Sequence, residues 1–353
     1  MKILIVKTSA LGDIIHAFPT LQYLRHKFPE AQIDWIVEKP FAEIVQAHPD
    51  VNKTLLVDTR TWRNEMFAAT TWEEIRSFRK SLHQQEYDVV FDLQSNIKSG
   101  LLTFQTKAKD KVGFGKETVH ESPNLFFTNK RWDPPRARNI REDYLFLAQS
   151  YFNDFETPAP QAVLFKLDAR QQASLKMVLN LPCMAEKSKV MVCPGSAWRN
   201  KQLEKSALID FLKLIRDQKQ CHLVLAWGNS EEKLQAEELH AQFLGQSTIL
   251  DRLSLPVLQN VMNRMELVIA VDSLPLHLAG TTSVKTFSVF GPSCADKFKP
   301  EGKKHQTFQG LCPYGRLFEK RCPVLRTCST GACIKSITGQ ALYNAFTTSR
   351  LQR

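Results

Sequence analysis

The sequence predicts an α/β protein built from two successive doubly wound domains. Short runs rich in branched apolar residues alternate with amphipathic helical stretches from the first residue onward. The alternation breaks once, in residues 153–160, where two prolines within three residues and polar neighbours indicate an interdomain linker. It then resumes, and a chain of 353 residues is long enough for two hydrophobic cores.

The first half of the chain contains four expected strands and two expected helices. The strands are short and rich in branched residues, at 3–6, 33–37, 54–57 and 89–93. The helices are the amphipathic stretches 14–28 and 72–83. This order predicts a parallel sheet that is covered by helices on both faces.

The second half repeats the pattern. Strands are expected at 190–193, 222–227, 267–271 and 284–290, and helices at 205–218 and 231–243. The predicted division is a first domain at 1–157, a linker at 158–172, a second domain at 173–335 and a tail at 336–353 with a helix at 338–346. Ligands of such sheets bind beyond the carboxyl ends of the strands, so we expect the active site in the cleft between the two domains.

The composition favours a cytosolic protein with anionic partners. No apolar run approaches the roughly 18 residues of a membrane span, and the first run stops after four residues, which is too short for a signal peptide. The formal charge is 47 − 36 = +11. Because the basic residues are scattered and form no recognisable binding motif, we expect an anionic substrate or a peripheral position on an anionic membrane, and no nucleic acid.

Eight cysteines are present, and four of them cluster near the end as Cys312, Cys322, Cys328 and Cys333. Without an export signal, reduced thiols or a metal site fit better than disulfides. The cluster lacks the C-x-x-C pairs of common zinc sites, so we expect reduced thiols and no metal. Cys193 and Cys221 lie in strand-like runs and are expected to be buried.

Three loops at strand ends carry candidate site residues. In the first, Gly12 allows close approach of the backbone to a ligand, and Asp13 at the start of a helix could accept a proton from a sugar hydroxyl as a general base. From position alone, Asp13 as a helix cap is the stronger interpretation. The loop is neither a G-x-G-x-x-G fingerprint nor a P-loop, which disfavours NAD and ATP-hydrolase functions.

The second loop, residues 193–201, offers a glycine, the hydroxyl of Ser196 and the cation of Lys201, which could neutralise a departing diphosphate. A solvated surface lysine is the alternative. In the third loop a helix beginning near Ser273 would direct N–H groups at a diphosphate, and Asp272 could hold sugar hydroxyls. His277 would lie one turn into that helix, as a ligand group or as a packed histidine.

The chain resembles the bacterial lipopolysaccharide heptosyltransferases, glycosyltransferase family 9, over nearly its whole length. The N-terminal half is most similar to heptosyltransferase I through KTSALGDIIHAFP (7–19), IDWIVEKPFAEI (33–44), YDVVFDLQSNIKS (87–99) and ETVHESPNLFFTNK (117–130). In the second half, WRNKQLEKSALIDF, LAWGNSEEK and VIAVDSLPLHLAG resemble donor-site segments of the family, and the cysteine-rich tail looks more like heptosyltransferase II.

The resemblance implies a GT-B fold and an inverting, metal-independent enzyme without a cofactor. It implies transfer of heptose from ADP-heptose to an anionic lipid A–Kdo acceptor on the cytoplasmic face of the inner membrane. Asp13 matches the family's proposed base, Lys201 its donor-phosphate lysine and Asp272 its carboxylate on the heptose hydroxyls. The remaining matched positions are Gly12, Ser196, Glu232, Ser273 and His277 for the donor, and Ser9, Arg60, Arg63 and His120 for the acceptor.

The chain departs from the family pattern at two places. The family usually has Asp-Thr-Gly-Leu where this chain has Asp272-Ser273-Leu274-Pro275, so Leu274 replaces the glycine. Pro275 lacks an N–H donor, although proline suits the first turn of a helix. His120 stands where the family has an arginine. A transferase of another nucleotide sugar, or a nucleotide-sugar-binding relative that no longer catalyses, therefore stay open as alternatives.

Overall fold

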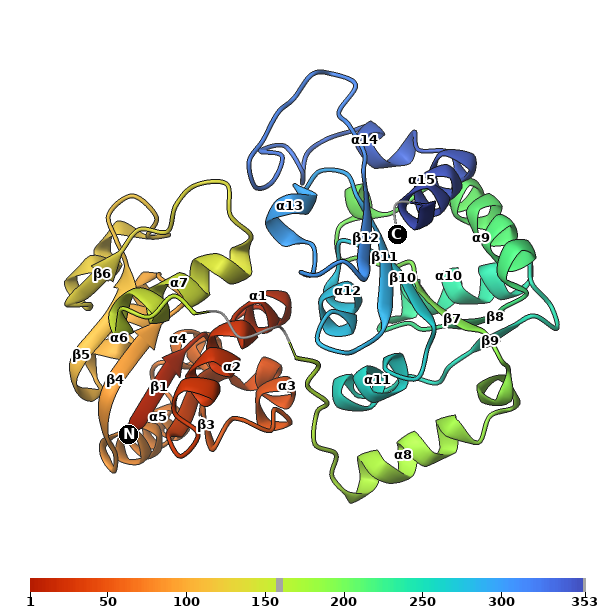
Figure 1. The fold of residues 1–353 in the computed structure, drawn as a ribbon. Helices are drawn as coiled ribbons and strands as arrows, with labels where there is room; N and C mark the ends of the chain where they lie inside the picture. The colour runs from red at the N-terminus through yellow and green to blue at the C-terminus, as the bar shows by residue number, and fades with distance from the viewer. Residues whose placement is uncertain (157–160, 352–353) are drawn as a thin grey trace. The chain divides into compact units, whose positions relative to one another are not determined.

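The computed structural model describes residues 1–156 and 161–351. It divides the chain into two compact units with the boundary after Pro160 (Figure 1). Each unit contains a six-stranded parallel sheet with helices on both faces. The predicted α/β class is confirmed.

The first unit has the strand order β3-β2-β1-β4-β5-β6. Its strands are β1 (Lys2–Val6), β2 (Gln32–Glu38), β3 (Lys53–Val57), β4 (Glu86–Asp92), β5 (Lys107–Phe114) and β6 (Lys130–Trp132). Its helices are α1 (Leu11–His16), α2 (Phe18–Lys27), α3 (Ala42–Gln46), α4 (Thr59–Asn64), α5 (Ala69–His83), α6 (Ile97–Phe104) and α7 (Ile140–Phe152), with short 3-10 helices η1 (Lys39–Phe41) and η2 (Ser122–Phe126).

Two helix layers cover the first sheet. On one face α2 packs against α7, where Phe91 of β4 meets Tyr151 and Phe152. On the other face side chains of α5 and α6, among them Phe78 and Leu102, join β1 and β4 in one apolar cluster. Burial of this apolar surface on both faces is what holds a parallel sheet together.

The second unit repeats the topology as β12-β11-β10-β7-β8-β9. Its strands are β7 (Lys189–Cys193), β8 (His222–Leu225), β9 (Ser247–Ile249), β10 (Leu267–Val271), β11 (Lys285–Phe290) and β12 (His305–Gln309). Its helices are α8 (Ala169–Leu179), α9 (Lys205–Lys219), α10 (Ser230–His240), α11 (Leu255–Met262), α12 (Leu274–Ala279), α13 (Ala295–Phe298), α14 (Ala332–Lys335) and α15 (Gly339–Leu351), with η3 (Pro182–Ala185) and η4 (Arg199–Lys201).

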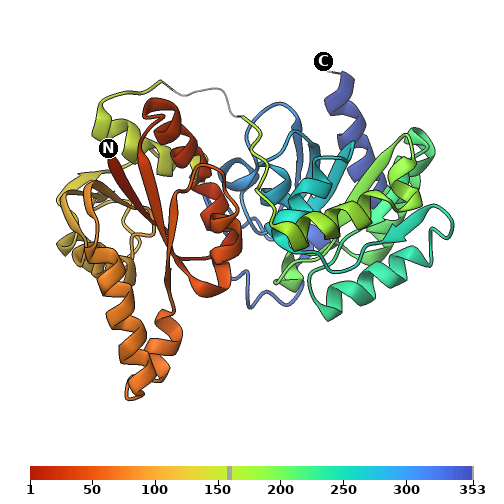
Figure 2. The same ribbon diagram turned by 90° about the horizontal axis from the view of Figure 1, so that it is seen from below.

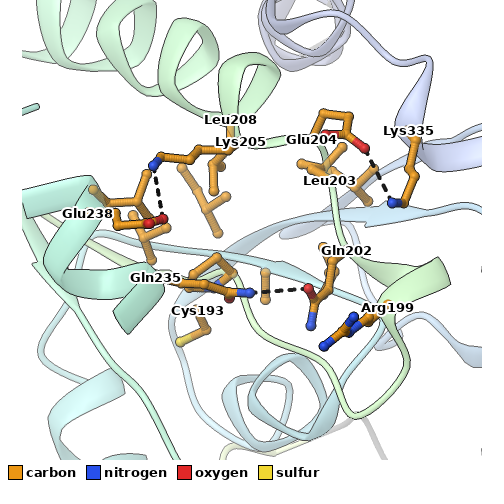
Figure 3. A pocket seen from close by; sticks show the side chains of 17 residues that line it. Cys193, Arg199, Gln202, Leu203, Glu204, Lys205, Leu208, Gln235, Glu238 and Lys335 are labelled. Atoms are coloured by element: carbon orange, nitrogen blue, oxygen red, sulfur yellow. Dashed lines mark hydrogen bonds and ion pairs between the residues drawn. The ribbon is translucent and has the colours of Figure 1, made fainter. Parts of the chain in front are cut away.

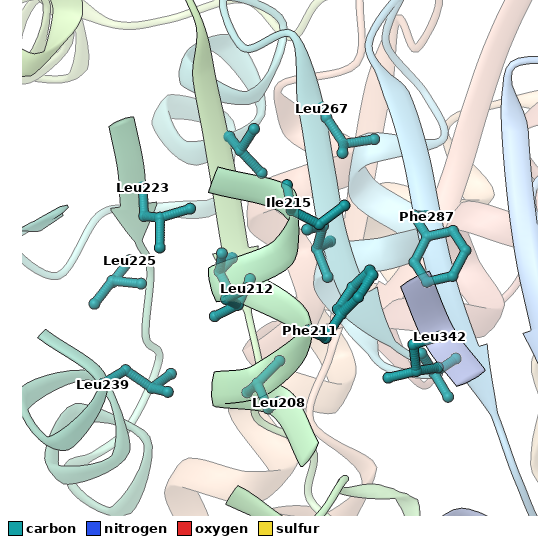
Figure 4. Packing of buried hydrophobic residues seen from close by; sticks show 14 of the residues in the cluster. Leu208, Phe211, Leu212, Ile215, Leu223, Leu225, Leu239, Leu267, Phe287 and Leu342 are labelled. Atoms are coloured by element: carbon teal, nitrogen blue, oxygen red, sulfur yellow. The ribbon is translucent and has the colours of Figure 1, made fainter. Parts of the chain in front are cut away.

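The core of the second unit joins segments that are far apart in the sequence. Phe211 of α9 contacts Phe287 of β11 and Phe346 of α15, with ring centres 5.2 and 6.3 Å apart. Figure 4 shows Leu342 of the same terminal helix in this cluster. The predicted tail is therefore part of the second core.

Most of the predicted linker, 158–172, belongs to the second unit. Residues 157–160 fall outside the described chain, and the structure assigns 161–172 to the second unit. Val163 N donates to Thr281 O at 2.9 Å, and Phe165, which is buried, donates its N–H to the Gln259 side chain at 3.0 Å. Helix α8 already begins at Ala169.

One expected helix is divided. The stretch 14–28 forms α1 and α2, with Ala17 between them and Pro19 at the second position of α2. Proline has no N–H to donate to the carbonyl four residues earlier, so the chain restarts a helix there. The buried positions predicted for Cys193 and Cys221 are confirmed, at 2 and 5% exposure.

The strand order determines where ligands can bind. In both sheets the order reverses between the unit's first and fourth strands, β1 and β4 or β7 and β10. The loops after these strands diverge to opposite faces, which leaves a crevice at their carboxyl ends. Within residues 1–156 and 161–351 no helix has the length and apolar character needed to cross a membrane.

Candidate active site

The first crevice is formed by the loops after β1 and β4. The Gln94 side-chain oxygen accepts hydrogen bonds from Thr8 N at 3.1 Å and Ser9 N at 3.2 Å. This amide therefore fixes the backbone of the predicted acceptor residue Ser9 against the neighbouring loop. Gln94 was not predicted, because nothing in its local sequence distinguishes it from a solvent-facing glutamine.

Asp13 lies in the first turn of α1 and does not cap it. The N-cap is Ala10, which provides no side-chain cap, and Asp13 is the third helical residue. The capping interpretation is therefore wrong. The Asp13 side chain is 36% exposed, and its Oδ1 lies 3.6 Å from Nδ1 of the buried His16. A carboxylate in this position is accessible to a hydroxyl and is favoured by the helix dipole. Gly12 precedes it in the same turn.

A buried lysine accompanies Asp13. Lys7 Nζ donates to Leu93 O at 3.2 Å and to Tyr144 Oη at 2.9 Å. Burial lowers the pKa of Lys7 to about 8, although the charges of Asp13 and Asp92 act in the opposite direction. Sequence reasoning missed Lys7, yet a lysine at the end of an apolar strand is a usable signal, since buried lysines need specific partners.

Asp92 anchors the loop after β4. It accepts hydrogen bonds from Ser95 N at 3.0 Å, from Ser99 Oγ at 2.9 Å and from Asn124 Nδ2 at 2.7 Å. Burial raises the pKa of Asp92, and these hydrogen bonds offset part of that rise. The carboxylate is fully enclosed, so it holds the loop in shape and does not face a ligand.

The other predicted acceptor residues lie at the same edge of the first sheet. Arg60 and Arg63 are exposed on α4, directly after β3. His120 has a 75% exposed side chain, and its N–H donates to Ser95 Oγ at 3.3 Å. The structure therefore connects His120 to the loop after β4 through its backbone and leaves its ring in solvent.

In the second unit Lys201, Asp272 and His277 form one buried group. Lys201 Nζ donates to Asp272 Oδ2 at 2.5 Å, and His277 Nε2 lies 3.4 Å from Asp272 Oδ1. All three are at most 7% exposed, so the interpretation of Lys201 as a solvated surface lysine is wrong. Burial opposes ionisation of Asp272, but the hydrogen bond from His277 and the charge of Lys201 outweigh it and hold its pKa below the usual range.

Helix α12 begins where the sequence predicted. Ser273 is its N-cap, but the hydroxyl makes no cap bond to the helix and donates to Val271 O at 3.4 Å. Pro275 occupies the first turn and contributes no N–H. His277 is buried in the same helix, and this places its imidazole beside Asp272.

Glu232 lies in the first turn of α10, which follows β8, and Ser196 lies in the loop after β7. Glu232 Oε2 accepts the Gly228 N–H at 2.7 Å. A Cβ on Gly195 would lie 2.4 Å from Glu232 Cγ, so only glycine permits this approach. Ser196 O accepts a hydrogen bond from the Gln202 side chain at 2.7 Å. These contacts connect Glu232 with the loop that carries Ser196 and Lys201.

A cavity of about 250 Å³ lies beside this loop, between the sheet and helices α9 and α10 (Figure 3). Its rim carries polar pairs, such as Lys205–Glu238 at 2.9 Å and Glu204–Lys335 at 3.3 Å. None of the predicted donor residues lines it. The cavity nevertheless adjoins the Lys201 group, because Gln202 and Val271, the chain neighbours of Lys201 and Asp272, line it.

The four tail cysteines, Cys312, Cys322, Cys328 and Cys333, line one small cavity of about 30 Å³ and are free thiols. The Asn200 side chain, next to Lys201, donates to the carbonyls of Leu325 and Cys328 at 2.9 Å. The tail thus supports the loop that carries Lys201. In the part of the chain that the structure describes, no three His, Cys, Asp or Glu residues form a ready metal-binding group.

Residues 75–325 match glycosyltransferase family 9 (heptosyltransferase). The chain is 29% identical over 294 residues to lipopolysaccharide heptosyltransferase 1 of Pseudomonas aeruginosa, covering 83% of this chain and 79% of that protein. It is 26% identical to the Escherichia coli K12 protein of the same name, over 83% of this chain and 88% of that protein.

The fold is similar to a solved structure of E. coli heptosyltransferase WaaC with ADP-2-deoxy-2-fluoro heptose. The TM-score is 0.75 at 25% identity, with 99% of each chain covered.

Proposed function

The chain belongs to glycosyltransferase family 9, the heptosyltransferases, and from this membership we propose that it transfers a heptose from ADP-L-glycero-D-manno-heptose to the Kdo-containing inner core of lipopolysaccharide. The names of the relatives and the ADP-sugar analogue bound to the E. coli protein support this donor and acceptor. The main structural support for this proposal is the position of two charged sites. Asp13 and the Lys201–Asp272–His277 group each lie where the strand order of their sheet reverses.

Asp13 is the proposed base. Its accessible carboxylate takes the proton from the acceptor hydroxyl as that oxygen attacks the anomeric carbon from the face opposite the diphosphate. The sugar passes through an oxocarbenium-like state and its configuration inverts. Ser9, Arg60, Arg63 and His120 are the proposed contacts for the anionic acceptor, because cations and hydroxyls there can bind its carboxylates and phosphates.

Lys201 is the proposed stabiliser of the leaving diphosphate. Asp272 orients its ammonium group, and a group held in place before the reaction stabilises developing charge without reorganising. One oxygen of Asp272 accepts a hydrogen bond from Lys201, and the other faces His277. A sugar hydroxyl would therefore donate to the remaining lone pairs of the Asp272 carboxylate. Gly12, Ser196, Glu232 and Ser273 complete the proposed donor contacts. With a fixed cation in this role, we expect transfer without a divalent metal.

The test is incubation with ADP-heptose and Kdo-lipid A in the presence of EDTA, followed by mass spectrometry of the lipid. A mass increment of one heptose is expected. Absence of the increment with wild-type protein, both in EDTA and with added Mg²⁺, would refute this donor and acceptor.

We predict that Asp13→Ala lowers kcat at least about 100-fold, the usual range for loss of a general base, while ADP binding changes less than twofold. The control is Glu30→Gln, an exposed acidic residue of the same unit, which should retain full turnover. An Asp13→Ala enzyme that kept a tenth of the wild-type kcat would remove Asp13 as the base.

Pro275 favours one alternative. It removes a backbone N–H from the first turn of α12, so the diphosphate or sugar contacts here differ from those of a glycine-containing turn. A transferase of another nucleotide sugar is the candidate that fits this difference. The same assay with other ADP- and UDP-sugars distinguishes it, because only the accepted donor produces its own mass increment. A relative that binds nucleotide sugars without catalysis would show ADP binding and no increment.

A further inference from the structure

We propose that the outer face of α6, together with η2, docks this protein onto an anionic lipid bilayer. We call this surface the α6 patch and define it by Ile97, Leu101, Phe104 and Phe126, with the basic residues Lys107, Lys109, Lys111 and Arg131 at its margin. The inference goes beyond the proposed function, because it concerns the surface that holds the enzyme at a membrane and not the reaction.

The apolar part of the patch is a helical stripe. Ile97, Leu101 and Phe104 are spaced by four and three residues, so they lie on one side of α6. They are 43, 49 and 65% exposed, whereas the opposite side of the helix, with Leu102 at 5%, packs into the core. Single exposed apolar residues are ordinary, but a helix with both faces apolar has an unpartnered surface.

Helix η2 continues this surface. A Cβ on Gly100 would lie 2.3 Å from the Phe127 ring, which shows how closely α6 approaches the residues after η2. The rings of Phe104 and Phe127 have their centres 6.0 Å apart. Phe126, the neighbour of Phe127, is 86% exposed. Two segments separated by about 20 residues therefore present their aromatic side chains on one surface.

Basic groups border the apolar stripe. Lys111 Nζ donates to Phe104 O at 3.0 Å and lies 5.5 Å from the centre of the Phe104 ring. The Arg131 guanidinium donates to Leu125 O, directly before Phe126. Lys107 and Lys109 are exposed on β5, the strand that carries Lys111.

Three acidic groups lie at this margin, and one of them, Glu86, is exposed and is the register partner of Lys107. Glu121 accepts the Ile97 N–H at 2.8 Å, and Asp110 accepts the Tyr151 hydroxyl at 2.8 Å. The margin is therefore positive, in a chain whose formal charge is +11.

The combination of exposed apolar side chains with a basic margin indicates that the partner of the α6 patch is an anionic lipid surface. Lysine is depleted at the centre of protein–protein interfaces, whereas apolar aromatic groups flanked by lysines fit the boundary between anionic headgroups and acyl chains. Lysine and arginine stems can also lie along apolar surface while their charges reach the headgroups.

The same helix layer carries a second group of exposed apolar residues. Met66, Phe67 and Trp72 are exposed at the connection between α4 and α5 and in the first turn of α5, with Phe67 at 96%. These helices cover the same face of the sheet as α6. Figure 2 shows the orange helices α4 and α5 projecting from one end of the first unit.

The test is cosedimentation of the full chain with vesicles of phosphatidylglycerol or of phosphatidylcholine, at low and high salt. We expect binding to the anionic vesicles, at least tenfold weaker binding to the neutral ones, and weakening by salt. The triple variant Leu101→Ser, Phe104→Ser, Phe126→Ser should lose at least tenfold in partitioning. The pair Lys109→Glu, Lys111→Glu should weaken binding and flatten its salt dependence.

The matched control is Met177→Ser, Leu234→Ser, Leu244→Ser, which removes three similarly exposed apolar residues from the second unit. It should bind vesicles like the wild type. Equal binding of the two triple variants overturns the proposal, as does an absence of wild-type binding to anionic vesicles. A wild-type dimer that the α6 triple variant dissociates, without any vesicle binding, would assign the patch to self-association and also overturn it.

Transfer assays separate this proposal from the proposed function. The α6 triple variant should keep its rate, within twofold, on a detergent-solubilised acceptor and lose it on an acceptor embedded in anionic vesicles. If the sugar or acceptor assignment is wrong, vesicle binding by the wild type and its loss in the variant still stand. If the patch assignment is wrong, transfer to the solubilised acceptor is unaffected.

Discussion

At the scale of single residues, each unit contains a buried lysine near its ligand crevice, and the two ammonium groups have different partners. Lys201 lies against the carboxylate of Asp272, whereas Lys7 donates to a carbonyl and a tyrosine hydroxyl. An ammonium group without a directly bonded carboxylate gains less from being charged, so burial dominates its titration. The two residues therefore respond differently to substitution and to pH.

Breaking the Lys201–Asp272 pair should destabilise the second unit strongly. We predict that Lys201→Met lowers the free energy of unfolding by about 3–5 kcal/mol, because Asp272 loses its cationic partner in a buried site. The double variant Lys201→Met, Asp272→Leu should cost less than the sum of the single changes. Urea unfolding of the four proteins measures this coupling.

An exposed pair serves as the control for that cycle. Lys205 and Glu238 lie 2.9 Å apart with both side chains 54% exposed. Solvent screening limits such a pair to about 0–1 kcal/mol. If Lys205→Met destabilised the protein as much as Lys201→Met, burial would not explain the difference between the two pairs.

Lys7 should give the protein a distinct pH dependence. The pKa of Lys7 is about 8 in the folded protein and about 10.4 when unfolded, so between these pH values the unfolded chain binds one more proton. The free energy of unfolding then rises with pH, by up to about 1.4 kcal/mol per pH unit. We predict this rise between pH 8 and 10 in the wild type relative to Lys7→Met, measured by urea unfolding. Parallel curves for the two proteins would contradict the low pKa.

At the scale of elements, the predictable strands are those that are buried on both faces. β10, Leu267–Val271, is buried throughout, and its apolar run predicted it. β5 begins with three lysines within five residues, and β12 is largely polar. Their sequences carry no strand signal, and pairing with β4 and β11 makes them strands. Local propensity cannot report such pairing.

The terminal helix α15 should behave as a core element. We predict that Phe346→Ala lowers the free energy of unfolding of the second unit by about 3–5 kcal/mol, since Phe346 is 1% exposed against Phe211 and Phe287. The control is Gln340→Ala on the exposed side of the same helix, which should change it by less than about 1 kcal/mol. Chemical denaturation followed by circular dichroism measures both. A small effect of Phe346→Ala would show that α15 contributes little to the core.

At the scale of the whole molecule, the chain repeats one topology twice and assigns different chemistry to each copy. Both sheets follow the same strand order and place a loop with a charged residue after their first strand. The first presents an accessible carboxylate at Asp13 and the second a buried cation at Lys201. In the proposed mechanism, proton removal and charge neutralisation therefore belong to separate units.

This division predicts where ADP acts. We expect saturating ADP to slow hydrogen exchange in the loops after β7, β8 and β10 and around Gly12, while exchange in the rest of residues 1–156 changes little. At a concentration of 100 Kd, the second unit should gain about 2.7 kcal/mol. Hydrogen-exchange mass spectrometry with and without ADP measures the distribution. An absence of protection around Gly12 would remove it from the proposed donor contacts, and equal protection throughout residues 1–156 would contradict the assignment of ADP to the second unit.

The sequence by itself determined the α/β class, the order of the apolar strands and the identity of Asp13, Lys201 and Asp272 as candidates. It also predicted a linker at 158–172, of which the structure assigns 161–172 to the second unit. Each of these predictions depends on local patterns in the sequence, namely hydrophobic periodicity, the positions of prolines and short motifs. Residues whose role depends on a distant partner were not visible in this way, as Gln94, Lys7 and Asp92 show.

The tertiary structure decided which candidates meet and in what environment. It excluded Asp13 as a helix cap, buried Lys201 against Asp272 and His277, and merged the tail into the second core. Lys201 and Asp272 are 71 residues apart, and only the pairing of β7 with β10 brings them together. Charge, burial and pKa are properties of such assembled surroundings, and a linear sequence specifies them only through the fold.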